Sequence, residues 1–329
     1  MSVLICGGAG YIGSHNVRAF LNHGEDVIVI DNLVTGHKQS LPENVKFYEG
    51  DIRDGKILDE IFTQNNIEAV IHFCAFSLVG ESVEKPLKYF NNNVGGMISL
   101  LEAMQRNDVK KIVFSSSAAV YGEPERIPIL ETDPTNPTNP YGESKRIMEK
   151  MMHWVSLQYD IRYVSLRYFN VAGAWHDGSI GEAHNHETHL VPIILQVPLG
   201  KREKVTVYGD DYNTPDGTCI RDYVYIEDLA DAHLLALEYL RKGGESQIFN
   251  LGSGDGYSVM EMINAARKAS GQEIKLEIGK RRAGDPARLV ADSSKARAIL
   301  KWQPKVTSME EIISTAWLWH KSHPNGYDA

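Results

Sequence analysis

The stretch that decides the fold is VLICGGAGYIG, residues 3–13. Its first four residues are an apolar run typical of a buried strand, and a helix-period pattern over residues 11–23 overlaps its end. Glycine lets the backbone turn tightly between the two elements, admits a pyrophosphate closely, and lets the helix pack against the strand. The helix N-terminus offers free N–H groups to phosphate oxygens. The stretch therefore predicts a dinucleotide-binding turn.

An acidic residue accompanies this turn. Asp31 closes the next predicted strand, 18 residues after Gly13. There its carboxylate can accept a hydrogen bond from a ribose 2′-hydroxyl, and it would repel a 2′-phosphate. A glycine triplet alone is a weak signal, but the strand, the helix and the acid together are specific. The pattern favours NAD over NADP as the cofactor.

The first half of the chain alternates short apolar runs with longer helical patterns. Strands are predicted at residues 3–6, 26–30, 46–48, 69–73, 111–114 and 162–166, and helices at 11–23, 57–64, 87–106 and 141–159. Near-continuous apolar strands alternating with helices predict an α/β fold whose parallel sheet is covered on both faces. Right-handed crossovers make this sheet doubly wound, a Rossmann fold with ligands at the carboxyl ends of its strands.

Two irregular stretches interrupt the alternation. Residues 123–140 hold five prolines, and residues 173–189 are rich in glycine, histidine and acidic residues. The later elements are shorter, which indicates a smaller α/β C-terminal domain. We expect an NAD-binding domain over 1–172, to which 222–252 returns, and a substrate-binding domain over 173–329. Capping-box spacings predict that two C-terminal helices start at Ser258/Glu261 and Thr307/Glu310.

Composition excludes several classes of protein. Of 329 residues, 34 are Lys or Arg and 43 are Asp or Glu, so the net charge is −9, which argues against non-specific nucleic-acid binding. Cys6, Cys74 and Cys219 are too few for a disulfide framework or a zinc ribbon, and we expect reduced core residues. Neither a signal peptide nor an apolar run of ~18 residues is present, so we expect a cytoplasmic protein without a membrane partner.

A serine cluster, a tyrosine and a lysine form a candidate catalytic group. Ser115, Ser116 and Ser117 follow the fifth predicted strand, while Tyr141 and Lys145 lie one helical turn apart. A phenol titrates near ~10, and a nearby ammonium favours the phenolate. Such a phenolate can take the proton of a hydroxyl as hydride leaves the same carbon, with Ser117 orienting the oxygen. Tyr-x-x-x-Lys alone is usually an exposed pair, but beside the nucleotide turn it predicts catalysis.

Together these motifs resemble the nucleotide-sugar epimerases of the extended short-chain dehydrogenase/reductase family, over essentially the whole chain. The matching segments are residues 7–13, 31–32, 50–52, 79–82, 93–94, 115–122, 141–145, 167–173, 221–223 and 282–285. The resemblance implies an isomerase that binds NAD and interconverts UDP-glucose and UDP-galactose through a 4-keto sugar. It also implies a homodimer, in which the helices predicted at 87–106 and 141–159 pack against their symmetry mates.

The resemblance further implies three sets of site residues. The catalytic set is Tyr141, Lys145 and Ser117. The cofactor-binding set is Gly7, Gly10, Tyr11, Ile12, Gly13, Asp31, Asn32, Asp51, Ile52, Phe73, Asn93, Ser115, Tyr141, Lys145 and Tyr168. The substrate-binding set is Ser117, Tyr141, Asn170, His189, Leu190, Val207, Tyr208, Arg221, Arg282 and Asp285. A planar guanidinium suits a pyrophosphate, but Arg221 as an interface ion pair and Asn170 as a turn residue stay open alternatives.

Two positions depart from the family pattern. Some members carry a lysine where this chain has Ser77, so the positive charge that those members have near the ligands is not carried over to this position. Leu289 aligns with the residue that gates the sugar pocket and is intermediate in size. We therefore expect UDP-glucose and UDP-galactose as the main pair, with some turnover of UDP-N-acetylglucosamine.

The same residues allow other interpretations. His184, His186 and His189 suggest a metal, but no cysteine is nearby, so no metal site is predicted. The resemblance implies instead that His189 contacts the uridine. A 4,6-dehydratase or decarboxylase of the same fold is the nearest alternative enzyme. Dehydration needs a carboxylate beside the serine, and residues 118–120 are Ala-Ala-Val. A cofactor-sensing protein without activity need not keep Ser117, Tyr141 and Lys145 together.

Overall fold

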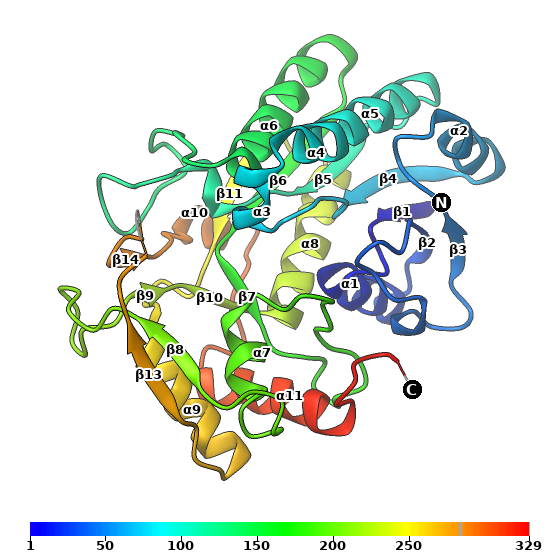
Figure 1. The fold of residues 1–329 in the computed structure, drawn as a ribbon. Helices are drawn as coiled ribbons and strands as arrows, with labels where there is room; N and C mark the ends of the chain where they lie inside the picture. Colours follow the sequence, from blue (N-terminus) through cyan, green and yellow to red (C-terminus); the bar gives the residue numbers. More distant parts are fainter. Residues whose placement is uncertain (283–284, 329) are drawn as a thin grey trace.

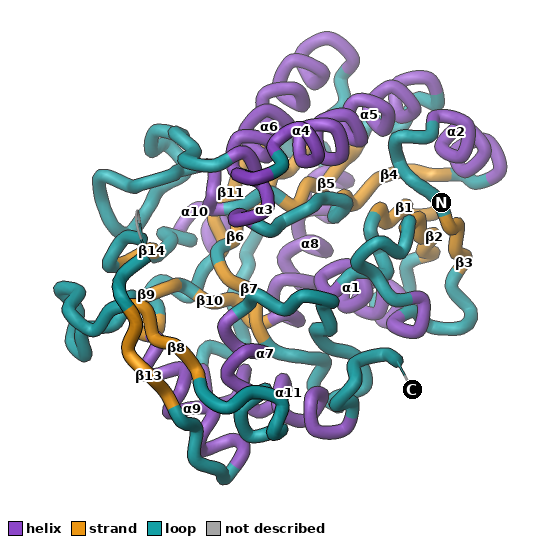
Figure 2. The backbone as a smooth tube through the Cα atoms, in the orientation of Figure 1, coloured by secondary structure: helices purple, strands orange, loops and turns teal. Residues whose placement is uncertain are grey.

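A computed structural model describes residues 1–282 and 285–328. Its centre is a seven-stranded parallel sheet in the order β11-β6-β5-β4-β1-β2-β3 (Figures 1 and 2). The strands are β1 (Ser2–Cys6), β2 (Asp26–Asp31), β3 (Lys46–Glu49), β4 (Ile67–His72), β5 (Lys111–Ser115), β6 (Arg162–Tyr168) and β11 (Gln247–Leu251). The predicted doubly wound α/β fold is confirmed. The strand order reverses between β1 and β4, where such sheets bind ligands.

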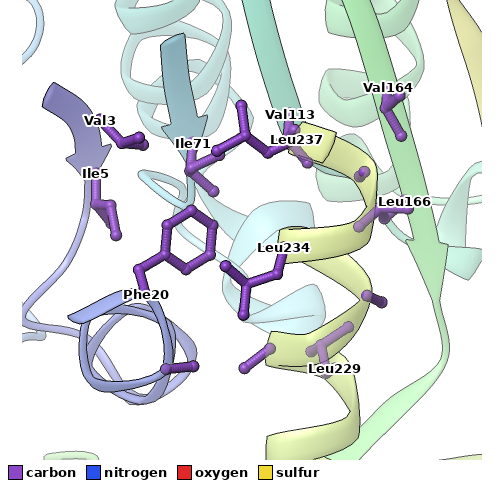
Figure 3. Close-up of a cluster of buried hydrophobic side chains, with 14 of the residues drawn as sticks. Val3, Ile5, Phe20, Ile71, Val113, Val164, Leu166, Leu229, Leu234 and Leu237 are labelled. Atoms are coloured by element: carbon purple, nitrogen blue, oxygen red, sulfur yellow. The ribbon is translucent and has the colours of Figure 1, made fainter. Parts of the chain in front are cut away.

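Helices cover both faces of the sheet because its strands are apolar on both sides. Along β1, Val3 and Ile5 belong to one buried cluster, while Leu4 and Cys6 belong to another. The first cluster lies under α1 (Tyr11–Asn22) and α8 (Ile226–Arg241), and Figure 3 shows Phe20 of α1 and Leu234 of α8 beside Ile5 and Ile71. The second lies under α2 (Gly55–Gln64), α5 (Gly96–Arg106) and α6 (Pro140–Tyr159). With both faces covered, the strand ends are left for ligands.

The helix predicted at 87–106 is interrupted. After α3 (Val79–Glu84), the chain forms α4 (Pro86–Tyr89), a π-helical segment (Phe90–Gly95) and then α5. Asparagines and glycines in this segment have low helix propensity. The wider π turn also accompanies an inward Asn93, whose side chain is fully buried. Such π turns often occur at functional sites.

The C-terminal part packs small sheets against short helices (Figure 1). Its strands are β7 (Asn170–Ala172), β8 (Val205–Tyr208), β9 (Ile220–Arg221), β10 (Tyr223–Tyr225), β12 (Tyr257–Ser258), β13 (Leu276–Gly279) and β14 (Arg288–Leu289). Its helices are α7 (Leu190–Leu195), α9 (Val259–Ser270), α10 (Ser294–Ile299) and α11 (Met309–Ser322). Short 3₁₀ turns lie at Lys38–Ser40 and Ala118–Val120. Chain segment 222–252 carries α8 and β11, so it returns to the central sheet.

One of the two predicted capping boxes forms. Ser258 Oγ accepts a hydrogen bond from Glu261 N at 3.0 Å, and the Glu261 carboxylate accepts one from Ser258 N at 2.7 Å. The box predicted at Thr307/Glu310 is wrong, because α11 begins after Ser308 and no side chain caps it. None of the described helices combines the length and apolarity that crossing a bilayer requires.

All three cysteines are free thiols, and Cys6 is fully buried in β1. Burial raises the pKa of Cys6 and Cys74. A high pKa suppresses the thiolate, so these two cysteines are unreactive, as expected for packing residues.

Candidate active site

The glycine turn joins the end of β1 to α1. Gly7 has a φ of +79°, and a Cβ atom there would lie 2.9 Å from the backbone nitrogen of Cys74. At Gly13, a Cβ atom would lie 2.0 Å from the Gly7 carbonyl oxygen. Both positions therefore require glycine, because the turn packs directly against backbone atoms.

Gly10 serves a different purpose, since a Cβ atom there would meet only the Gly7 carbonyl oxygen, at 3.4 Å. It is the N-cap of α1, and it has no side chain to bond the first N–H groups of the helix, which begins at Tyr11 and Ile12. The first turn also holds no acidic residue. The free N–H groups and the positive end of the helix dipole are thus available to an anion. The turn fits the pyrophosphate of a dinucleotide.

Asp31 ties the glycine turn to the end of β2. Its side chain is buried, and its two oxygens accept hydrogen bonds from Ala9 N at 2.9 Å and Leu33 N at 2.8 Å. Burial raises the pKa of this carboxyl, and the backbone hydrogen bonds oppose the rise. The carboxylate lies at the strand end where the sequence predicts recognition of a ribose.

The residues predicted to flank the adenine follow β3. Arg53 donates to both oxygens of Asp51, at 2.9 and 2.6 Å, and Asn32 donates to the same carboxylate at 3.0 Å. The Arg53 hydrogen bonds in particular lower the pKa of Asp51 to about 2. Ile52 is buried beside Gly96 of α5. Sequence reasoning missed Arg53, although an arginine two residues after Asp51 was visible as its partner.

Tyr141 reaches the end of β5 because α6 begins beside it. Asn139 caps the helix by accepting a hydrogen bond from Gly142 N at 2.9 Å. Gly142 also lets the helix approach the turn after β5, since a Cβ atom there would lie 2.4 Å from the Ala119 carbonyl oxygen. This close packing brings the Tyr141 phenol near Ser117, whose side chain acts to lower the phenol pKa.

Lys145 follows one turn along α6 and is only 2 % exposed. Its Nζ donates to the Ser115 carbonyl at 2.7 Å and lies 5.9 Å from the centre of the Tyr141 ring. Burial lowers the pKa of Lys145 to about 7. Burial also raises the pKa of Tyr141, and the hydrogen bond with Ser117 opposes this rise. The net pKa shift of the phenol in this structure is therefore upward, because desolvation is its largest cause.

A buried polar network lies next to Ser117, Tyr141 and Lys145. Glu149 of α6 accepts hydrogen bonds from Ser116 at 2.7 Å and from Arg167 of β6 at 2.9 and 2.6 Å. Arg167 also donates to the Tyr121 hydroxyl at 2.9 Å, and Tyr121 donates to Asn250 of β11 at 2.6 Å. The network links β5, β6, β11 and α6, and it fixes the residue next to Ser117. Sequence reasoning missed it because its members are far apart in the chain.

Tyr168 and Phe73 lie at neighbouring strand ends. The Tyr168 hydroxyl is hydrogen-bonded to Ser115, and burial raises the pKa of Tyr168. The Phe73 ring lies 4.8 Å from the ring of His233 in α8. The predicted cofactor residues of β4, β5 and β6 thus converge at one edge of the sheet.

Asn93 is occupied by protein partners. Its amide oxygen accepts from Phe76 N at 2.9 Å, and its nitrogen donates to the Phe76 carbonyl at 3.1 Å and to Ser144 at 2.9 Å. Both polar atoms of the amide are therefore used. In this structure Asn93 holds the segment after β4 against the start of α6, so it acts on the site as a positioning residue.

The predicted uridine-diphosphate residues lie in the C-terminal part, on several different elements. Arg221 of β9 is paired with Asp285 in this structure, and Arg282 lies 4.0 Å from the centre of the Tyr208 ring. Residues 283 and 284 of the matching segment lie outside the described residues. Val207 is buried in a hydrophobic cluster, so its side chain is part of the core. Asn170 of β7 donates to the Asp222 carbonyl at 3.0 Å, and Leu190 begins α7.

Comparison with known proteins identifies the family. The model of the NAD dependent epimerase/dehydratase family matches residues 3–252. The chain belongs to the NAD-dependent epimerase/dehydratase family. It is 58% identical to a UDP-glucose 4-epimerase of Lacticaseibacillus casei, over 99% of both chains. It also matches a crystal structure of a UDP-glucose 4-epimerase with a TM-score of 0.99 at 56% identity, covering 100% of both chains. The Bifidobacterium longum enzyme in complex with NAD+ and UDP matches with a TM-score of 0.93 at 41% identity, over 99% of this chain and 100% of that one.

Membership of this NAD-dependent family confirms NAD as the cofactor, which Asp31 predicted. The residues present fit it, because the glycine turn of this epimerase/dehydratase chain leaves the amides of α1 open and Asp31 stands at the end of β2. The prediction of an epimerase-family member from the combined motifs is likewise confirmed.

His189, which was expected at the uridine, lies beside an acidic side chain. It is the N-cap residue of α7, directly before Leu190, and its Nδ1 contacts Glu182. His184 lies beside it, with Nδ1 3.2 Å from Glu182 and 3.5 Å from Glu187. The two glutamates were not considered as partners of these histidines. Acidic residues at 182 and 187, alternating with histidines at 184 and 189, were the available signal.

Proposed function

We propose that this chain inverts C4 of UDP-hexoses and interconverts UDP-glucose and UDP-galactose through a 4-keto sugar. The observation that carries the proposal is the convergence of Ser117, Tyr141 and Lys145 at the end of β5. It is supported by the names of the full-length relatives, which are UDP-glucose 4-epimerases.

Each side chain has a task that its position allows. NAD, when bound, supplies the acceptor and donor of hydride. The Tyr141 oxygen takes the proton of the sugar 4-hydroxyl and later returns it, and the Ser117 hydroxyl orients the same sugar oxygen. Lys145 is held against the strand end through the Ser115 carbonyl, and its protonated form counters negative charge on the phenol.

Inversion requires the keto sugar to present its other face before hydride returns. The nucleotide must therefore stay bound while the sugar turns, so binding energy belongs on the uridine diphosphate rather than on the hexose. Arg221, Arg282 and Asp285 supply charged groups for that purpose. On binding, a pyrophosphate would compete with Asp285 for Arg221, which Asp285 occupies in this structure.

The dehydratase alternative lacks a side chain in the required place. Ser117 is followed by a 3₁₀ turn of Ala118–Val120, and its Oγ accepts a hydrogen bond from Ala119 N at 3.1 Å. No carboxyl or hydroxyl group stands at these three positions to act on C5 and C6 of the sugar. This local sequence favours epimerisation.

The test is C4 inversion of UDP-galactose, followed by a coupled readout of UDP-glucose. We expect Tyr141→Phe to lose about 10²–10⁴-fold in kcat while binding UDP as before. The matched control is Tyr159→Phe, since Tyr159 ends the same helix and is 40 % exposed. Near-full turnover by Tyr141→Phe, or a stable keto-sugar product from the wild type, would refute the proposal.

Sugar range is a second part of the proposal. Leu289 of β14 packs beside the small cluster of Val120, Tyr121 and Ile129. Val120 belongs to the 3₁₀ turn that follows Ser117. A leucine is smaller than an aromatic side chain and leaves more room for a 2-acetamido group. We expect slower but measurable turnover of UDP-N-acetylglucosamine, and its complete absence would contradict this assignment.

We also propose a homodimer through α4, α5 and α6. Large apolar side chains are exposed along these helices, with Leu87 81 % exposed, Trp154 68 % and Leu157 67 %. A patch of this kind marks an interaction surface. Light scattering should give twice the chain mass for the wild type, and Trp154→Glu should give monomers. Ile299→Glu, which changes an exposed apolar residue of α10, serves as the control and should leave the dimer intact.

A further inference from the structure

Two histidines and two glutamates meet between β7 and α7. One ligand atom from each of Glu182, His184, Glu187 and His189 lies within 4.8 Å of all the others. His184 Nδ1 is 3.2 Å from Glu182 and 3.5 Å from Glu187, and His189 Nδ1 is 3.7 Å from Glu187 and in contact with Glu182. Both imidazoles therefore direct the same nitrogen toward the same two carboxylates.

The carboxylates are buried without a lysine or an arginine. The side chains of Glu182 and Glu187 are 4 % and 8 % exposed, and within residues 1–282 and 285–328 their ionic partners are the two histidines alone. Buried charges are normally paired or bound to a metal. His184 Nδ1 is also buried and makes no hydrogen bond of acceptable geometry to any described residue, although two carboxylate oxygens face it. The two carboxylate oxygens near this nitrogen, at 3.2 and 3.5 Å, belong to different glutamates.

We propose that Glu182, His184, Glu187 and His189 form a four-coordinate zinc site. In a tetrahedral zinc centre with bonds of about 2.0–2.1 Å, neighbouring ligand atoms are about 3.3 Å apart. Three separations, 3.2, 3.5 and 3.7 Å, lie near this value, and His189 Nδ1 would have to move away from Glu182, with which it is in direct contact. Imidazole nitrogen with carboxylate oxygen in four-fold geometry favours zinc over magnesium or calcium, which prefer six or more oxygen ligands.

Four protein ligands leave no open position, so the site is structural rather than catalytic. The metal would fix the segment before α7 where this segment contacts both α11 and the start of α1. The Glu182 carbonyl accepts a hydrogen bond from Trp319 of α11 at 3.1 Å, and the Ala183 carbonyl lies 2.8 Å from His37 Nε2. The His184 ring makes an edge contact with Tyr11, the first residue of α1. The metal would therefore hold the C-terminal part against the glycine turn.

The test uses the full-length, untagged protein. After treatment with EDTA and reloading with zinc sulfate, the wild type should retain one zinc per chain and melt at least about 2 °C higher than the zinc-free protein. Cobalt in place of zinc should give visible bands typical of tetrahedral coordination, and zinc should displace them. A zinc content far below one per chain, or the lack of such bands, would overturn the proposal and leave a cluster of ion pairs.

Two variants assign the ligands. His184→Ala and Glu187→Gln should each lose at least tenfold in zinc affinity, the second without a change in side-chain shape. His186→Asn is the matched control, because His186 is exposed in the same loop, has a φ of +72° that asparagine tolerates, and lies outside the cluster. It should keep one zinc per chain. Equal zinc affinity in the wild type, Glu187→Gln and His186→Asn would show that the metal binds elsewhere.

Discussion

Removal of the Glu149 carboxylate tests whether the buried network holds the end of β5. Glu149 and Arg167 are 6 % and 4 % exposed, and Glu149 accepts two hydrogen bonds from Arg167 and one from Ser116. Glu149→Ala leaves the guanidinium buried with the Tyr121 hydroxyl as its remaining partner in this network. Breaking a buried ion pair in this way costs about 3–5 kcal/mol. We expect the free energy of unfolding to fall by that amount in urea denaturation.

The control is an exposed pair in the same domain. Asp59 and Arg106 are 50 % and 46 % exposed, so Asp59→Ala should cost less than about 1 kcal/mol. The double variant Glu149→Leu with Arg167→Met removes both charges and should regain most of the loss. If Glu149→Ala costs no more than Asp59→Ala, burial does not determine the energy of the Glu149–Arg167 pair, and the reasoning is refuted.

Two further predictions concern the glycine turn and the lysine. Gly13→Ala places a Cβ atom 2.0 Å from a carbonyl oxygen, so this variant should lose about 1–3 kcal/mol of stability and most of its bound NAD. The control is Gly10→Ala, whose Cβ atom would lie 3.4 Å from the same oxygen and which should keep its stability. Equal melting temperatures of the two variants would contradict this prediction. Lys145→Met removes an ammonium whose pKa burial lowers from 10.5 to about 7. Between pH 9 and pH 7 the unfolded chain binds this proton and the folded chain largely does not, so wild-type stability falls as the pH drops. The stability of Lys145→Met relative to the wild type should therefore grow by up to about 2.7 kcal/mol between pH 9 and pH 7, at about 1.36 kcal/mol per pH unit. A stability difference that does not change with pH would show that burial does not lower the Lys145 pKa.

The central sheet was predictable because its strands are apolar on both faces and its turn residues are glycines. Strand β11 was not among the predicted strands, although its segment was expected to return to the sheet. Its sequence, Gln247–Leu251, is short and contains Asn250, which looks unsuited to a buried strand. Asn250 is buried because it accepts a hydrogen bond from Tyr121 and donates to the Ile129 carbonyl at 2.9 Å. Such compensation comes from residues more than a hundred positions away and leaves no local pattern.

In the candidate site, too, local sequence rules predict some features, while others depend on tertiary contacts. Spacing places Tyr141 and Lys145 on one helical face, and the position of Ser117 after an apolar run places it at a strand end, so local rules bring these three together. The sign of a pKa shift depends on how much water each group loses, which spacing does not contain, and this is why the phenol pKa rises where a fall was expected. The pairing of His184 with Glu182 and Glu187 needs only a loop that folds back within eight residues. A sequence pattern that requires cysteine among the zinc ligands does not detect this pairing. A buried carboxylate, however, is also a deprotonated donor that can bind zinc.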